Sequence, residues 1–280
     1  MNLASRKTVK EILKKYNIRP SKKFGQNFLI DKQVIRKIIK TAELKPLDTV
    51  LEIGPGIGTL TQEIAKKAKK VIAIEKDPKM CEILRETLEV KPPKEVQPRN
   101  IKVIQKDILK FNKFPKDYKI VANLPFYLTA PVIRKFLENV EVGLQQMVLV
   151  VQKEVGQRIY AKPPKMNLLA VSVQFYAKPI IIDYISKSSF WPEPKVDAAI
   201  IKIIPRSSAY YSAEFYKRFF KIVKAGFSHP RKQILNNLAN GLQLKKNNVQ
   251  KYLLKNNIKP SQRAETLSIT DWLNLAKMLK

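Results

Sequence analysis

The first half of the chain alternates between short apolar runs and amphipathic segments of helical period. The runs occupy residues 49–53, 71–74, 101–104, 119–122 and 147–151. Strands alternating with helices are typical of a parallel sheet with right-handed crossovers. Two later apolar segments, 175–185 and 196–204, are joined by a loop too short for a helix, so we expect them to pair antiparallel at the sheet edge. The pattern predicts an α/β fold, a Rossmann-like sheet of seven strands.

Helical patterns also flank this predicted sheet. Residues 1–23 hold eight basic side chains and one acidic one, and apolar residues at helical spacing predict a short basic helix there. After residue 206 four helical patterns follow, the last opened by a capping box from Ser268 to Asp271. We therefore divide the chain into a basic N-terminal extension (1–20), a Rossmann-like domain (21–206) and a small C-terminal α-helical domain (207–280).

Basic residues far outnumber acidic ones. The chain holds 54 Lys and Arg against 23 Asp and Glu, a formal charge of +31. Residues 207–280 alone hold 14 basic and three acidic side chains. Such an excess repels itself and favours a polyanionic partner. We predict that the C-terminal helical domain binds RNA; a lysine-rich composition without a nucleic-acid partner is the alternative.

The composition also excludes several kinds of site. Cys81 and His229 are each the single residue of their type, which excludes an intrachain disulfide, His/Cys zinc clusters and Ser-His-Asp or Cys-His catalysis. No apolar run approaches the roughly 18 residues of a membrane span. The basic N-terminus lacks the apolar core of a secretory signal, although a transit peptide stays open. We expect a cytoplasmic protein that makes no membrane contact.

Three glycines follow the first apolar run at alternate positions, Gly54, Gly56 and Gly58. Glycine turns sharply and lets a ligand approach the bare backbone, as in the first strand-to-helix turn of doubly wound sheets. Glu75 ends the next run 21 residues after Gly54, where a carboxylate binds ribose hydroxyls. Neither a pyrophosphate fingerprint nor a phosphate loop is present, so we predict a nucleoside cofactor without phosphates, S-adenosyl-L-methionine. A tight turn in any parallel α/β protein is the alternative.

Other residues extend this predicted site. Gln26 and Asn27 precede a helix that Asp31 is placed to cap, and they form a polar wall for a ligand. Asp107 ends the third run and either accepts from the adenine amino group of the cofactor or caps a helix. Phe190, between the last two predicted strands, is either an aromatic clamp for a target base or a core phenylalanine.

The tetrapeptide Asn123-Leu-Pro-Phe126 follows the fourth run, at the sheet edge where a ligand crevice is expected. It suits methylation of an exocyclic amino group on a base. The Asn123 amide oxygen and the Leu124 carbonyl accept from the amino hydrogens, which aims the nitrogen lone pair at the methyl sulfonium. Pro125 rigidifies the turn, and Phe126 offers a face on which an extruded base stacks. No metal is needed, and an ordinary Asn-X-Pro turn is the alternative.

Further motifs occur in a fixed order along the chain. They are Phe24-Gly-Gln-Asn-Phe-Leu29, Leu51-Glu-Ile-Gly-Pro-Gly56, Val151-Gln-Lys-Glu-Val155, Phe190-Trp-Pro-Glu-Pro-Lys-Val196, Gly226-Phe-Ser-His-Pro-Arg-Lys232 and Arg263-Ala-Glu-Thr-Leu-Ser268. With Glu75, Asp107 and the Asn-Leu-Pro-Phe tetrapeptide, the order resembles the ribosomal RNA adenine dimethyltransferases over roughly residues 20–275. The last two motifs are closer to the bacterial small-subunit enzymes than to the macrolide-resistance enzymes that act on 23S rRNA.

The resemblance implies an S-adenosylmethionine-dependent methyltransferase domain that dimethylates N6 of two adjacent adenosines. The target is the 3′-terminal hairpin of 16S rRNA in the immature 30S subunit, and we expect a monomer. The resemblance places Asn27, Leu29, Gly54, Glu75, Asp107 and Asn123 in the cofactor site. We add Gln26, Gly56, Lys76 and Ile108 to that set. There are two alternatives. One is a 23S rRNA methyltransferase of the macrolide-resistance type, and the other is an RNA-binding 30S assembly factor whose methylation is secondary.

Two features depart from the family pattern. Phe126 stands where many relatives have tyrosine, so stacking is kept while a hydroxyl contact is lost. The basic extension before Ser21 is longer than the first motif requires, and the sequence does not assign it a role.

Overall fold

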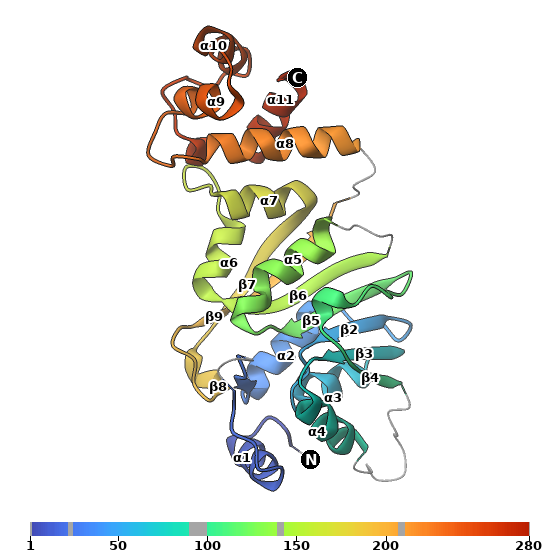
Figure 1. Cartoon of the computed structure of the whole chain (residues 1–280). Helices are drawn as coiled ribbons and strands as arrows, with labels where there is room; N and C mark the ends of the chain where they lie inside the picture. Colours follow the sequence, from blue (N-terminus) through green and yellow to red (C-terminus); the bar gives the residue numbers. More distant parts are fainter. Residues whose placement is uncertain (1, 22–24, 90–99, 139–142, 207–210, 280) are drawn as a thin grey trace. The chain divides into compact units, whose positions relative to one another are not determined.

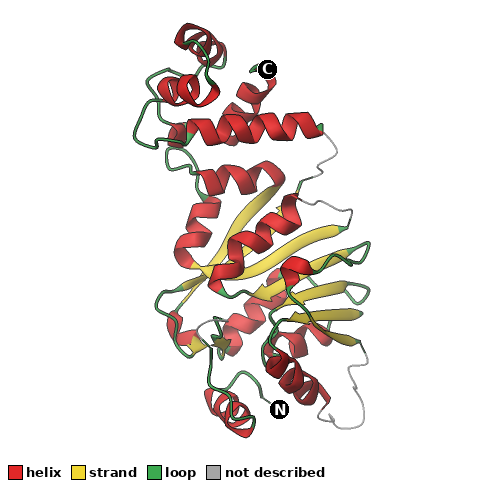
Figure 2. Cartoon of the chain, viewed as in Figure 1, coloured by secondary structure: helices red, strands yellow, loops and turns green. Residues whose placement is uncertain are grey.

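The computed structural model describes residues 2–21, 25–89, 100–138, 143–206 and 211–279 (Figures 1 and 2). Several predicted features lie outside this part of the chain. They are Phe24, nearly all of the proline-rich surface loop predicted at residues 91–100, and residues 207–210 at the start of the predicted C-terminal domain. None of the helices in the described ranges combines the length and the hydropathy that a membrane crossing needs.

A seven-stranded sheet organises the N-terminal part of the chain, in the order β4-β3-β2-β5-β6-β9-β7. The strands are β2 (Thr49–Ile53), β3 (Lys70–Glu75), β4 (Ile101–Gln105), β5 (Tyr118–Asn123), β6 (Leu144–Gln152), β7 (Ala177–Ile185) and β9 (Ala198–Pro205), with a separate pair of β1 (Phe28–Leu29) and β8 (Phe190–Trp191). β2 to β6 pair in parallel, as predicted. β9 runs antiparallel to β6 and separates it from β7.

Helices follow the strands as the alternating pattern predicts. Those of the N-terminal part are α1 (Arg6–Lys15), α2 (Lys32–Thr41), α3 (Thr59–Ala65), α4 (Pro78–Glu89), α5 (Thr129–Glu138) and α6 (Lys153–Tyr160), with the short 3₁₀ turns η1 (Ile108–Lys110), η2 (Phe126–Leu128) and η3 (Lys187–Ser189). α2 begins where expected, because the Asp31 carboxylate accepts from the backbone N–H groups of Gln33 and Val34. α2 and α3 share one buried cluster with alternate residues of the strands, so they cover one face of the sheet.

The N-terminal helix α1 packs on the same compact unit as the sheet. Val9, Ile12 and Leu13 are buried in a cluster with Phe28 and with residues of α4. Outside this cluster, Lys15 pairs with Glu86 of α4 and the Lys10 ammonium lies over the Trp191 ring. The extension is therefore an integral part of the first unit. The predicted division at residue 20 is corrected accordingly, because the same unit continues from the N-terminus to Gly156.

Leu13→Ala is expected to lower the free energy of unfolding by about 2 kcal/mol, because the deletion opens a cavity in this cluster. Urea denaturation followed by circular dichroism measures the change. Lys14→Ala, on the exposed side of the same helix, is the control and leaves the free energy unchanged. Equal stability of Leu13→Ala and the wild type would show that α1 does not contribute to the core.

The second compact unit combines Gln157–Pro179 with Arg206–Lys280. It contains α7 (Leu168–Tyr176), α8 (Ala213–Gly226), α9 (Ile234–Leu242), α10 (Lys246–Lys255), η4 (Ala264–Thr266) and α11 (Ile269–Met278). The four helices after residue 206 match the predicted ones, including the capping box of Ser268 and Asp271. The sheet strand predicted from residue 175 begins at Ala177 instead, because α7 continues to Tyr176.

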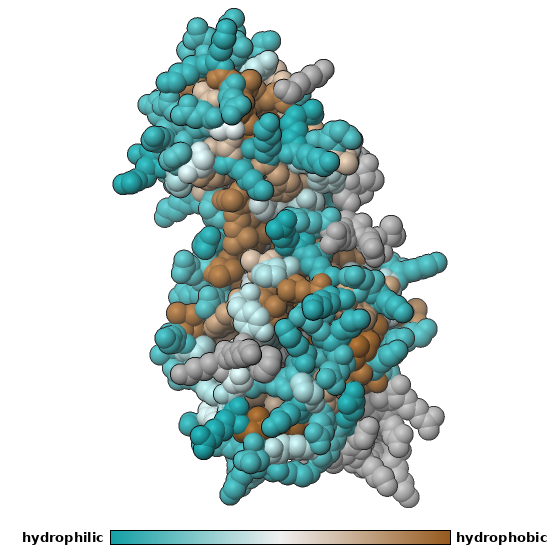
Figure 3. Space-filling view, in the orientation of Figure 1, coloured by the Kyte–Doolittle hydropathy of each residue, from teal (hydrophilic) through white to brown (hydrophobic). Residues whose placement is uncertain are grey.

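The predicted domain boundary at residue 206 also needs a correction. The Phe175 ring of α7 packs against Tyr216, Phe219 and Phe220 of α8, with ring centroids 4.1–5.4 Å apart. The Met166 N–H donates to the Glu265 carbonyl at 2.9 Å. These contacts place residues 157–179 in the second unit. On the face drawn in Figure 3, hydrophilic residues cover most of the surface of both units, as the high charge requires.

Candidate active site

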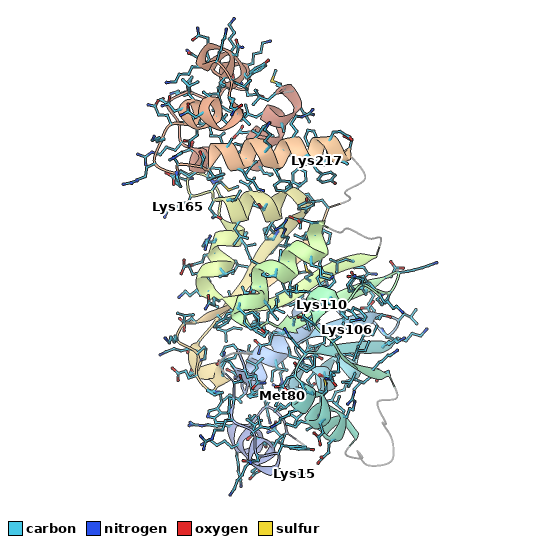
Figure 4. All side chains as sticks on the ribbon, in the orientation of Figure 1. Lys15, Met80, Lys106, Lys110, Lys165 and Lys217 are labelled. Atoms are coloured by element: carbon cyan, nitrogen blue, oxygen red, sulfur yellow. The ribbon has the colours of Figure 1, made fainter. Side chains whose placement is uncertain are left out.

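A pocket lies at the carboxyl ends of β2, β3, β4 and β5, where parallel α/β sheets bind ligands. All ten residues predicted to contact a cofactor line it: Gln26, Asn27, Leu29, Gly54, Gly56, Glu75, Lys76, Asp107, Ile108 and Asn123. The structure thus brings together residues spread over about a hundred positions of the sequence, from four strand ends and the segment before α2. Figure 4 labels two further lining residues, Met80 on α4 and Lys106 after β4.

The turn after β2 presents bare backbone to this pocket. Gly54 and Gly56 have φ values of +66° and +57°, which L side chains rarely adopt. A Cβ atom at Gly56 would lie 3.3 Å from the Phe28 ring, so a side chain there would also crowd the pocket wall. The backbone N–H of Gly54 donates to the Ile74 carbonyl at 3.0 Å and joins the turn to β3.

Glu75 ends β3 inside the pocket. Its Oε1 accepts from the backbone N–H groups of Lys76 at 2.7 Å and Asp77 at 2.9 Å. A carboxylate has about four lone-pair sites, so further acceptor sites are left for the vicinal hydroxyls of a ribose. Burial raises the pKa of Glu75, against the opposing effect of the backbone N–H groups of Asp77, Lys76 and Gly56.

Asp107 and Lys76 form an ion pair at the pocket wall, with 2.9 Å between Nζ and Oδ2. The hydrogen bond from Lys76 lowers the pKa of Asp107. The other oxygen, Oδ1, accepts from the Leu109 N–H at 2.9 Å and caps η1. The helix-cap role weighed for Asp107 is therefore observed, and its place in the pocket lining leaves the predicted contact with the adenine amino group as a prediction.

The Asn123-Leu-Pro-Phe126 corner follows β5 at the same edge of the sheet. The Asn123 Nδ2 donates to the Asn27 carbonyl at 3.0 Å, which fixes the orientation of the amide and leaves Oδ1 as its acceptor end. Leu124 is buried, and its N–H donates to the Val150 carbonyl at 3.3 Å. Pro125 lines the pocket beside Gly25, where a Cβ atom would lie 3.0 Å from the proline Cβ.

The aromatic residues of the site differ from the predicted ones. Phe126 begins η2 and is partly buried, but the next residue, Tyr127, is 52 % exposed and lines the pocket. Phe190 is only 4 % exposed, because pairing of β8 with β1 holds its ring in the core with Leu29 and Ile35. Phe190 therefore packs in the core and does not line the pocket, which supports the core interpretation, while the clamp role stays a prediction.

Comparison with known proteins identifies the family of this chain. A model of the ribosomal RNA adenine dimethylases matches residues 17–280. The chain belongs to this family.

Relatives and solved structures agree with this assignment. The ribosomal RNA small subunit methyltransferase A of Dehalococcoides mccartyi is 42 % identical and aligns over 94 % of this chain and 89 % of its own length. That of Alkaliphilus oremlandii is 39 % identical over 99 % of both chains. The 23S rRNA methyltransferase ErmE has a similar structure, with a TM-score of 0.74 and 27 % identity over 90 % of this chain and 98 % of its own. A dimethyladenosine transferase from Plasmodium falciparum is also similar in structure, with a TM-score of 0.72 and 28 % sequence identity. The match covers 88 % of this chain and 94 % of the transferase.

The family activity is dimethylation of adenine in ribosomal RNA, with S-adenosylmethionine as the methyl donor. The pocket of this dimethylase fits the donor. The positive-φ glycine turn offers bare backbone, and the Glu75 carboxylate keeps free acceptor sites for ribose hydroxyls. When bound, S-adenosylmethionine supplies an electrophilic methyl group. The residues around it bind and orient the two reactants.

Tyr127 and Glu52 are among the pocket residues that the sequence reasoning missed. Tyr127 directly follows the recognised tetrapeptide, and its position next to a site motif was the available signal. Glu52, inside the Leu-Glu-Ile-Gly motif, was counted with an apolar strand, but it lines the pocket and is 1 % exposed. Burial raises the pKa of Glu52 to about 8. The hydrogen bond with the Thr61 hydroxyl opposes this rise, and the negative charge of Glu75 adds to it. A carboxyl that is protonated near neutral pH inside a strand has no signature in the sequence.

Glu52→Gln is expected to change how stability depends on pH. The native state holds the Glu52 proton up to about pH 8, while the unfolded state loses it near 4.5, the usual pKa of a glutamate. Wild-type stability therefore falls as pH rises between these values, by about 2 kcal/mol between pH 6 and pH 8. Urea denaturation across this range should show a smaller loss in Glu52→Gln. Parallel curves for the two proteins would mean that Glu52 is already ionised at pH 6.

Proposed function

We propose that this dimethylase methylates N6 of two adjacent adenosines in the 3′-terminal hairpin of 16S rRNA during assembly of the small ribosomal subunit. The observation that carries the proposal is the Asn123 amide, which lines the glycine-turn pocket and is oriented by its hydrogen bond to the Asn27 carbonyl. The choice of the small subunit is supported by relatives at 36–42 % identity that are named ribosomal RNA small subunit methyltransferase A.

The corner of β5 activates a poor nucleophile by position. The lone pair of an adenine N6 is delocalised into the ring. When Asn123 Oδ1 and the Leu124 carbonyl accept its two hydrogens, the lone pair points toward the methyl group. N6 then bonds to the methyl carbon as the carbon–sulfur bond breaks, and the nitrogen releases a proton to water. Positioning and fixed dipoles supply this catalysis, and Tyr127 and Phe126 offer faces for the extruded base.

The reaction suggests roles for eight of the ten predicted pocket residues. Glu75 binds the ribose hydroxyls, while Asp107 and Ile108 contact the adenine. Gly54 and Gly56 pass close to the donor, and Asn27 anchors the Asn123 amide. Gln26 donates to Asp77 at 3.0 Å and steadies the loop beside Glu75.

The second unit carries a strongly basic surface that suits RNA. Residues 207–280 hold 14 basic and three acidic side chains, and Arg231, Lys232 and Lys255 are among those exposed. We assign this unit the docking of the rRNA outside the pocket. The protein acts as a monomer on immature 30S subunits in the cytoplasm.

Transfer of a labelled methyl group from S-adenosylmethionine to 30S subunits that lack the modification tests the function. Two methyl groups on each of two adjacent adenosines of the 16S hairpin are expected, as mapped by mass spectrometry. Unlabelled 30S subunits together with label on 23S rRNA would replace the proposal with the activity of ErmE-like enzymes.

A further inference from the structure

A second concave surface lies between α2, α3 and residues 2–4. It has a volume of about 750 Å³. The cationic side chains that line it are Lys32, Arg36 and Lys40 of α2, with Lys66 and Lys67 after α3. We call these five residues and the space between them the basic groove. They are all exposed, and none belongs to a sequence motif recognised above.

The arrangement of these cations costs stability in the free protein. Lys32, Arg36 and Lys40 are four residues apart, so they form a row on one face of α2 at intervals of about 6 Å. Like charges at this spacing repel each other by about 0.2–0.5 kcal/mol per pair. Lys32 also lies in the first turn of α2, where a cation opposes the helix dipole. An anion in the groove would remove both costs.

The protein itself provides little of that counter-charge. Among the described residues, Lys32, Arg36, Lys40 and Lys67 take part in no ion pair, while Lys66 pairs with Glu63 at 2.6 Å. Glu63 itself lines the groove, and the remaining lining residues, such as Asn2, Gln62 and Thr59, are neutral. The groove therefore presents four uncompensated positive charges along its walls.

The chemistry of the groove favours a nucleic-acid backbone over an acidic protein. Its apolar lining residues Leu3, Ile35 and Ile39 are each no more than 6 % exposed, so the groove lacks the apolar anchors that dominate protein interfaces. A row of evenly spaced cations instead suits a chain of evenly spaced phosphates. Thr59 lines both the groove and the cofactor pocket, which places the groove next to the reaction site within the same unit.

We propose that the basic groove binds backbone phosphates of the rRNA substrate outside the target adenosines. This inference rests on the proposed function for the identity of the RNA. The groove provides affinity without sequence reading, because Lys and Arg contacts to phosphates are independent of the base. It lies on the methyltransferase unit, apart from the basic surface of the second unit.

The double variant Arg36→Gln/Lys40→Gln tests the groove in the full-length protein. Binding to 30S subunits that lack the modification is measured as a function of salt. We expect at least tenfold weaker binding at moderate salt, and a slope of log K against log salt that is shallower by about two, one for each lost phosphate contact. At saturating 30S concentration kcat stays at the wild-type value while KM rises, because neither residue lines the cofactor pocket.

Two controls separate a local role from a general effect of charge. Lys113→Gln/Lys116→Gln removes two exposed cations of the same unit in the segment before β5, outside the groove lining, and should bind as the wild type does. Arg36→Lys/Lys40→Arg keeps both charges in the groove and should restore the affinity and the slope. A melting temperature no lower than that of the wild type, together with unchanged cofactor affinity, confirms for all three variants that the fold is intact.

The inference is overturned if the groove variant and the Lys113/Lys116 control lose equal affinity, or if neither loses any. It is also overturned if the groove variant loses affinity for a polyglutamate peptide but keeps that for 30S subunits, which would indicate an acidic protein partner. A wild-type enzyme that binds 30S subunits through the groove but methylates no adenosine would reject the proposed function and leave the groove assignment in place.

Discussion

Asn123→Ala is expected to lower kcat for methylation of 30S subunits by 10²- to 10³-fold, about 3–4 kcal/mol of barrier. The variant removes the oxygen that accepts from the adenine amino group, and no neighbouring side chain replaces it. Because Asn123 also donates to the Asn27 carbonyl, cofactor affinity should fall several-fold at most. Single-turnover methyl transfer measures the chemical step, and calorimetry with S-adenosylmethionine measures binding.

Asn112→Ala is the matched control, an equal truncation at an exposed position 11 residues earlier in the chain. It should leave both quantities unchanged. A kcat for Asn123→Ala within threefold of the wild type would show that the β5 corner does not activate the amine. The same variant separates an enzyme from an assembly factor. If cells that carry Asn123→Ala assemble small subunits normally, while removal of the second unit blocks assembly, then binding is the main role.

Glu75→Ala is expected to weaken binding of S-adenosylmethionine by about 100-fold or more. The change removes two hydrogen bonds from ribose hydroxyls to a charged acceptor, each worth about 1.5–3 kcal/mol. It also leaves the backbone N–H groups of Lys76 and Asp77 without their partner. Calorimetry at fixed pH gives the dissociation constant. Glu82→Ala, an exposed carboxylate on α4, is the control and should bind as the wild type does.

The pH dependence gives an independent check on Glu75. Burial raises its pKa above the usual value, and the ribose hydroxyls donate more strongly to the ionised form than to the protonated one. Affinity of the wild type should therefore fall as the pH is lowered through this raised pKa. Glu75→Gln should bind weakly at every pH, with no such fall. A wild-type affinity that is constant in acid would mean that the carboxylate does not contact the ribose.

The local sequence determined most of the elements and the composition of the pocket. Apolar runs placed β2 within its observed bounds, and the Asp31 and Ser268 caps placed the starts of α2 and α11. These signals are local, because periodicity and capping act over a few residues. Parallel strands all end at one edge of a sheet. For this reason residues at strand ends, such as Gly54, Glu75 and Asp107, could be assigned to one pocket before any contact was known.

Only the tertiary structure decided which side chains face the pocket and which face the core. Pairing of β8 with β1 turned Phe190 inward, and the fold placed Tyr127 at the pocket and buried Glu52 as a carboxyl with a raised pKa. The aromatic packing of Phe175 moved residues 157–179 into the second unit. Each outcome depends on partners far away in the chain. Burial and orientation arise from such contacts, and no short stretch of sequence contains them.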